Sequence, residues 1–220
     1  MLVAQGISKY YGNLKVLRSV DLTVAQGEVV AITGASGAGK STLLHVLATL
    51  ERPDSGILQL DKVDLLTLRG KPLASFRNSA IGFVFQLYNL LPEFTTLENV
   101  CMPGYIRGDE RNVVEAKGKS LLALLNLSAR SHHKPSVLSG GEQQRAAMAR
   151  ALLNSPKIVF ADEPSGNLDS ENAAALHALF FELRDKTGQT FVLATHNPTL
   201  ADMADRQLLL RDGKLVEGAV

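Results

Sequence analysis

The stretch Gly34-Ala35-Ser36-Gly37-Ala38-Gly39-Lys40-Ser41 decides the fold of this chain. It matches the phosphate-loop pattern G-x-x-x-x-G-K-[ST] at every fixed position. The apolar residues 29–32 before it predict a β-strand, and residues 41–47 after it predict the start of an amphipathic helix. A chance match in an ordinary glycine-rich turn is the alternative, and both flanks argue against it.

The residue types in this loop explain why it suits phosphate. Glycines let the backbone wrap closely around an anion, because no Cβ atom intervenes. The turn directs consecutive N–H groups inward, and the helix N-terminus adds positive potential. We expect the Lys40 ammonium to reach the β- and γ-phosphates of a nucleotide and the Ser41 hydroxyl to ligate Mg²⁺, with Thr42 completing the phosphate-binding set.

Length and composition limit the classes of protein to consider. The chain has 220 residues, of which 45% are hydrophobic and 20% charged, which predicts one soluble globular domain with room for a subdomain. The net charge of +1 gives no bulk attraction to nucleic acid. The single cysteine, Cys101, excludes an internal disulfide and indicates a reducing compartment. No apolar run is long enough to span a bilayer.

Polar residues follow several apolar runs that predict buried strands. Asp162 and Glu163 follow residues 157–161, Gln86 follows residues 81–85, and His196 follows residues 191–194. Ligands bind at such strand ends in open α/β sheets, so we expect Asp162 to hold Mg²⁺ and Glu163 to polarise an attacking water. The position of His196 favours a phosphate contact. Gln86 taken alone fits a surface glutamine at least as well as a magnesium ligand.

The remaining periodicity outlines the other elements. Short strands at residues 2–4 and 22–24 predict an antiparallel layer ahead of the phosphate loop. Helical spacing at residues 113–126 and 142–153 predicts a mostly helical insert at 87–153. Another helix begins near Asp169, and residues 206–220 predict a hairpin that turns at Asp212-Gly213.

A second glycine motif, Leu138-Ser139-Gly140-Gly141-Glu142-Gln143, stands before the helix at 142–153. Ser139 is a good N-cap, and the two glycines allow close backbone approach at a helix start. From the residues alone, an anion-binding site and a well-capped helix are equally acceptable interpretations.

The phosphate loop, Gln86, the 138–143 motif, Asp162-Glu163, Asn167-Leu168-Asp169 and His196 occur in that order. Together they resemble the nucleotide-binding domain of ABC transporters over essentially the whole chain. The Leu-Ser-Gly-Gly sequence is the most diagnostic part, because other phosphate-loop ATPases lack it. The resemblance implies an α/β fold: a P-loop NTPase (RecA-like) core at 1–86 and 154–220, which includes an N-terminal antiparallel β subdomain, and an inserted helical subdomain at 87–153, all within one domain, 1–220.

The resemblance also implies an ATPase with ATP and Mg²⁺ as cofactors. In such a site Tyr11 stacks on adenine, Gln86 contacts Mg²⁺ and senses a transmembrane partner, Glu163 is the catalytic base, and His196 contacts the γ-phosphate. It further implies a head-to-tail homodimer. Ser139, Gly140 and Gly141 of one copy would complete the ATP site of the other, with Asp169 signalling across the interface.

Three stretches carry a finer resemblance, namely residues 41–45, 90–100 and 161–169. They look like the ATPases of bacterial lipoprotein-releasing systems, which are similar to the macrolide-exporter and cell-division ATPases of the same branch. Ser165 stands where that branch usually has Thr, and both carry a hydroxyl. The implied function is to power lipoprotein release through integral permease subunits, from the cytoplasmic face of the inner membrane.

Other outputs of the same ATPase stay open at this point. A macrolide or peptide exporter, or a cell-division complex, would use the same motifs. An ABC ATPase that acts on DNA or ribosomes is disfavoured, because the segment between Lys40 and Asp162 has no heptad run, the chain has one cassette, and its charge is nearly neutral.

Overall fold

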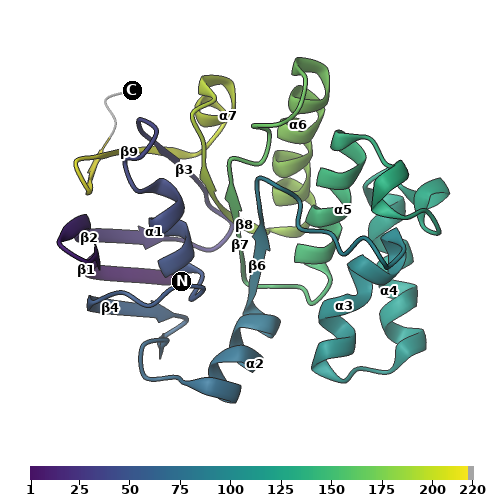
Figure 1. Cartoon of the computed structure of the whole chain (residues 1–220), viewed down its shortest axis with the longest axis horizontal. Helices are drawn as coiled ribbons and strands as arrows, with labels where there is room; N and C mark the ends of the chain where they lie inside the picture. The colour runs from purple at the N-terminus through teal and green to yellow at the C-terminus, as the bar shows by residue number, and fades with distance from the viewer. Residues whose placement is uncertain (218–220) are drawn as a thin grey trace.

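The computed structural model describes residues 1–217, in which two β-sheets are flanked by helices (Figure 1). The strands are β1 (Leu2–Tyr11), β2 (Leu14–Val24), β3 (Val29–Thr33), β4 (Ser55–Leu60), β5 (Val63–Asp64), β6 (Ile81–Val84), β7 (Ile158–Asp162), β8 (Thr190–Ala194), β9 (Arg206–Arg211) and β10 (Lys214–Glu217). The helices are α1 (Lys40–Leu47), α2 (Gly70–Ala80), α3 (Thr96–Arg107), α4 (Arg111–Leu124), α5 (Gly140–Leu152), α6 (Ser170–Thr187) and α7 (Pro198–Asp202), with short 3₁₀ turns at Ser128–Arg130 and Pro135–Val137. This arrangement confirms the predicted α/β fold class.

The larger sheet has six strands in the order β10-β9-β3-β8-β7-β6. All neighbours except the β9–β10 hairpin are parallel. Strands β7 and β8 are buried along their whole length, which explains their continuous apolar sequences. Because the strands are parallel and in close register, with Asp162 opposite Ala194 and Ile32 opposite Ala194, their carboxyl ends meet at one edge.

The smaller sheet is antiparallel, with the order β2-β1-β4-β5. The prediction of short strands was wrong here, because β1 and β2 are 10 and 11 residues long. Strand β1 pairs with β2 and β4, and its pairing with both is irregular near Gln5 and Gly6, where the strand nevertheless continues. Tyr11 is therefore the last residue of β1.

The helices of residues 96–152 gather at the end of the molecule opposite the small sheet (Figure 1). Helices α2, α3 and α7 had not been predicted individually. Helix α3 starts with a complete capping box, in which the Thr95 hydroxyl accepts from the Glu98 N–H and the Glu98 carboxylate accepts from the Thr95 N–H. Helix α5 lies directly on β6, so closely that a Cβ atom at Gly82 would be 2.6 Å from the Ala151 carbonyl oxygen.

Two further predictions concern membrane-spanning segments and the C-terminal hairpin. Within residues 1–217, no helix combines the length and the apolar character needed to cross a membrane. Strands β9 and β10 form the predicted hairpin, and residues 218–220 of that prediction lie outside the described part of the chain.

We expect the glycine near the start of β4, Gly56, to be required for stability. Gly56 has φ +116°, and a Cβ there would lie 2.7 Å from Gln5 O and 2.8 Å from the Ile7 Cα atom. Gly56→Ala should lower the free energy of unfolding by about 2–4 kcal/mol, measured by chemical denaturation. Gly12 is the matched control, since it has φ +59° and a Cβ atom there would meet no heavy atom of a non-neighbouring residue within 4 Å. Its Ala variant should cost about 1 kcal/mol, and equal costs at the two positions would contradict the close approach at Gly56.

Candidate active site

The carboxyl edge of the parallel sheet holds a cavity of about 570 Å³. Its lining brings together the phosphate loop and the residues that follow three other strands, namely Val16, Ser36, Gly37, Gly39, Lys40, Ser41, Thr42, Gln86, Glu163 and His196. Ala35 and Ala38 line an adjoining cavity on the far side of the loop. Segments that are remote in sequence meet here because their parallel strands end at the same edge.

The phosphate loop depends on glycine at two positions. A Cβ at Gly34 would lie 2.4 Å from the Leu210 carbonyl oxygen, and φ is +146° there. Gly39 caps the N-terminus of α1 in the left-handed region, with φ 101°, and a Cβ there would lie 2.9 Å from the Val16 side chain. Because these two positions lack a Cβ atom, the loop can pack directly against β9 and β2. Its N–H groups stay available for an anion.

The Lys40 side chain folds back over this loop. Its Nζ donates to the carbonyl oxygens of Gly34 at 2.9 Å and Ala35 at 3.3 Å, and it lies 3.6 Å from Glu163 Oε1. The stem is buried, so the ammonium group is held at the centre of the site instead of sampling solvent. A cation fixed beside a ring of N–H donors suits a polyphosphate.

Ser41 and Asp162 lie together and could hold a divalent metal. The Ser41 hydroxyl donates to Asp162 Oδ1 at 3.1 Å, and Gln86 lines the same cavity. Burial raises the pKa of the Asp162 carboxyl, and the hydrogen bond from Ser41 opposes that rise. Among residues 1–217, no three His, Cys, Asp or Glu side chains cluster into a metal cage. A hydroxyl and a carboxylate with room for further ligands fit Mg²⁺, which keeps waters and phosphate oxygens in its shell.

Glu163 bridges Lys40 and His196. Its Oε2 accepts from the His196 N–H at 3.2 Å and lies 2.8 Å from His196 Nδ1, while Oε1 faces Lys40. Its φ of 44° is unusual for a residue with a side chain, and its N–H donates to the Ala194 carbonyl oxygen at 2.9 Å. A strained backbone of this kind persists only where the surroundings hold it, and it is common at functional sites.

Gly34 and Asp162 lie behind residues that line the cavity, since they bond to Lys40 and Ser41, whereas Tyr11 and the second glycine motif are not part of the lining. The Tyr11 hydroxyl donates to Glu51 Oε2 at 2.5 Å, and its ring is exposed at the end of β1. Ser139, Gly140 and Gly141 do not line the cavity. Ser139 caps α5, where its hydroxyl accepts from the Glu142 N–H and the Glu142 carboxylate accepts from the Ser139 N–H.

Two residues at or near the site, Val16 and His45, were not predicted from the sequence. Val16, from β2, lines the cavity, and an apolar residue inside a strand gives no sequence signal for such a role. His45, to which no role was assigned, lies on α1 with its Nε2 atom 4.0 Å from Asp162 Oδ2. His45 lies four residues after Ser41, and this spacing could have indicated that the two side chains lie on the same face of a helix.

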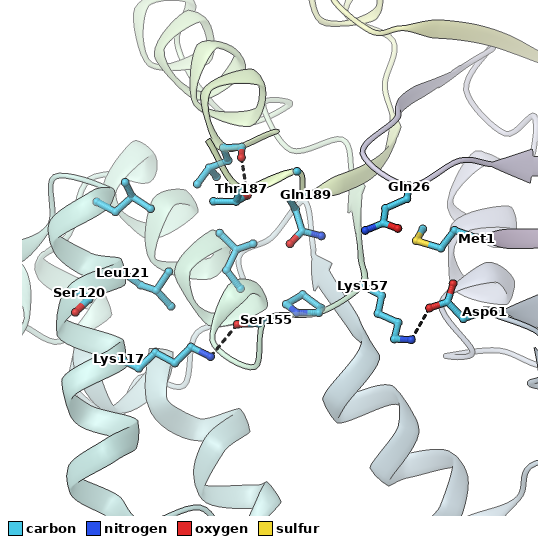
Figure 2. A pocket seen from close by; sticks show the side chains of 15 residues that line it. Met1, Gln26, Asp61, Lys117, Ser120, Leu121, Ser155, Lys157, Thr187 and Gln189 are labelled. Carbon is cyan, nitrogen blue, oxygen red and sulfur yellow. Dashed lines mark hydrogen bonds and ion pairs between the residues drawn. The ribbon is translucent and has the colours of Figure 1, made fainter. Parts of the chain in front are cut away.

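A second cavity, of about 630 Å³, lies at the opposite edge of the sheet, near the starts of β7 and β8 (Figure 2). Its amines already have partners: Lys157 pairs with Asp61, and Lys117 donates to Ser155 Oγ at 2.9 Å. Glycine-rich anion-binding backbone is not part of its lining, so its size alone does not make it a nucleotide site.

A strand, a glycine-rich loop and a helix that present lysine and serine, with an acid at the end of a neighbouring parallel strand, define a phosphate-loop NTPase. The family model described as ABC transporter matches residues 17–166. The chain therefore belongs to the ABC transporter family and is one of its ATPases.

Similar proteins extend this assignment along the whole chain. The lipoprotein-releasing system ATP-binding protein LolD of Cytophaga hutchinsonii is 54% identical over 218 residues, covering 98% of this chain and 99% of that protein. LolD of Bacteroides fragilis is 49% identical over 98% of this chain and 100% of its own length. A dimeric post-hydrolysis structure of the ATP-binding cassette MJ0796 bound to ADP and Pi has a TM-score of 0.89 and 35% identity, covering 98% of this chain and 96% of that one.

Proposed function

We propose that this chain hydrolyses ATP to drive a bacterial membrane transporter that releases lipoproteins from the inner membrane. The observation that carries the ATPase assignment is the placement of Glu163 between Lys40 and His196, beside the Ser41–Asp162 pair. Lipoproteins are the favoured cargo because full-length LolD relatives are about half identical to this chain. These relatives do not favour the macrolide-exporter and cell-division alternatives.

Each side chain has a role that follows from its position. Lys40 and the loop N–H groups bind the β- and γ-phosphates, and His196 contacts the γ-phosphate. Glu163 orients the attacking water and accepts its proton, because its carboxylate faces the cavity between two cationic or hydrogen-bonding partners. Ser41, Asp162 and Gln86 would hold Mg²⁺, which would supply positive charge to the phosphates. Tyr11 supports the adenine by stacking.

The second glycine motif requires another copy of the chain. Ser139, Gly140 and Gly141 begin α5, whose N-terminus is suited to an anion, yet they do not line the cavity of their own protomer. A second protomer turned around by two-fold symmetry would bring them to the first protomer's ATP. The MJ0796 structure described above and a second structure of that cassette are both described as dimeric. Asp169, the exposed N-cap of α6, would then signal across the interface.

The segment after β6 is the proposed docking site for the permease. Leu87, Leu91 and Phe94 are all exposed there, with Leu87 72% accessible. Exposed apolar side chains that lie close together commonly mark protein interfaces. Because these residues are close to Gln86 in the chain, movement of the permease would be passed to the ATP site. The chain would be bound peripherally to the cytoplasmic face of the inner membrane. Binding energy that differs between open and closed dimers can do the mechanical work.

Copurification from detergent-solubilised membranes of the native host tests this function. We expect integral permease subunits and lipoprotein cargo to accompany the tagged chain. Leu87→Asp should weaken this capture at least tenfold by placing a charge in an apolar contact, whereas the matched control Val63→Asp, on β5 of the other sheet, should not. Recovery of ribosomes or nucleic acid instead, or of an exporter without lipoproteins, would contradict the proposed output.

A further inference from the structure

His177 is a buried titratable group that the proposed mechanism does not use. It lies on α6 with 3% of its surface exposed, and its Nε2 atom is 2.9 Å from the Ser165 hydroxyl. Ser165 is itself only 8% exposed, and neither residue lines the nucleotide cavity. A buried histidine and a buried serine that are paired with each other form a fixed link between α6 and the loop before it.

Ser165 belongs to the tight turn that follows Glu163. The Gly166 N–H donates to the Glu163 carbonyl oxygen at 3.0 Å, and the Leu168 N–H donates to the Ser165 carbonyl oxygen at 3.1 Å. Asn167 Nδ2 donates to the Gln86 carbonyl oxygen at 3.1 Å. The turn therefore joins the carboxylate of Glu163 to the segment that carries Gln86.

This turn starts from the left-handed backbone of Glu163, with φ 44°. Such a conformation is unfavourable for a residue with a Cβ atom and must be held by contacts elsewhere. The main-chain bonds within the turn fix its internal shape. The Glu163 N–H bond to Ala194 O and the Asn167 bond to Gln86 O attach the turn to the sheet edge. The His177–Ser165 bond attaches it to α6.

We propose that His177 is a positioning residue for Glu163, which anchors the 163–168 turn to α6 through the Ser165 hydroxyl. This inference rests on the proposed ATPase function and deepens it. The anchor keeps the Glu163 carboxylate within 3.6 Å of Lys40 Nζ and 2.8 Å of His196 Nδ1. Burial lowers the pKa of His177, so the neutral ring is the form that meets the serine hydroxyl.

A small displacement of the catalytic carboxylate should affect chemistry more than binding. A misplacement of about 1 Å can lower a rate about 10²-fold, whereas the phosphate loop that binds ATP is formed by other segments. Loss of the anchor should therefore lower kcat and leave the KM for ATP nearly unchanged. A residue with a merely structural role would lower stability and would not separate the two constants.

Two substitutions at position 177 make a matched pair. The amide nitrogen of Gln occupies about the place of histidine Nε2, whereas that of Asn corresponds to Nδ1 and falls short of Ser165. We expect His177→Asn to lower kcat about tenfold, with KM and the ATP dissociation constant within about twofold of wild type. His177→Gln should recover most of the lost kcat. Melting temperatures of both variants check that they fold equally well.

Two substitutions of Ser165, the other partner in this hydrogen bond, give an independent matched pair of variants. Ser165→Thr keeps the hydroxyl, and Ser165→Val has nearly the shape of threonine without it. The Val variant should reproduce the loss of kcat and the Thr variant should not, so this pair decides the matter if the position 177 variants do not fold. Equal kcat values within both pairs, or losses of kcat that follow melting temperature alone, would overturn the inference. A wild-type protein without ATPase activity would instead refute the proposed function.

Discussion

Glu163→Gln should bind Mg·ATP and form the dimer while losing at least about 10²-fold in turnover. The substitution keeps the size of the side chain and its hydrogen bonding toward His196, but an amide cannot accept a proton from the attacking water. It also removes the negative charge that faces Lys40. ATP should therefore stay bound in a closed dimer, detectable by gel filtration with ATP and by release of labelled phosphate.

Glu171→Gln is the matched control for this variant. Glu171 is exposed in the first turn of α6 and lies outside the cavity lining, so the same chemical change there should leave turnover unaltered. Full turnover by Glu163→Gln would remove Glu163 from the role of base. A loss of ATP affinity equal to the loss of turnover would assign it to binding instead.

Lys40→Ala should lose most of the nucleotide affinity. Lys40 Nζ is the buried cation of the phosphate loop, and it also holds the carbonyl oxygens of Gly34 and Ala35. Removing charge-assisted bonds worth about 1.5–3 kcal/mol each should weaken ATP binding about 10²-fold or more, measured by titration calorimetry.

Lys157→Ala is the comparison for this change. Lys157 pairs with Asp61 beside the cavity at the opposite sheet edge, so its removal should not change the dissociation constant for ATP (Figure 2). An unchanged dissociation constant in Lys40→Ala would refute the assignment of the phosphate loop.

The convergence of Lys40, Glu163 and His196 could be predicted from sequence for a simple physical reason. Each follows an apolar run that forms a parallel strand, and the carboxyl ends of parallel strands meet at one edge. Local pattern and topology together are enough to place these residues at one site. The distances between their side chains depend on rotamers and on the strained backbone of Glu163, which sequence patterns do not report.

Elements whose form depends on distant contacts could not be predicted as well. Strand β1 continues through polar residues because it pairs with β2 on one side and β4 on the other. The helix α3 was missed although Thr95 and Glu98 carry a capping-box signature, which a search for such pairs would have found. The proposed role of His177 depends on its contact with Ser165, which forms only in the folded chain. A single histidine in a helical sequence therefore did not indicate this role.

The most direct test of the proposed mechanism mixes two inactive variants, Lys40→Ala and Ser139→Arg. Each variant alone should fail, because in a head-to-tail dimer Lys40 of one copy and Ser139 of the other belong to the same ATP site. In the mixed dimer one site is intact, so an equimolar mixture should regain up to about a quarter of wild-type turnover when pairing is random. No recovery in the mixture, or full activity of the Ser139→Arg protein by itself, would contradict an ATP site shared between two copies.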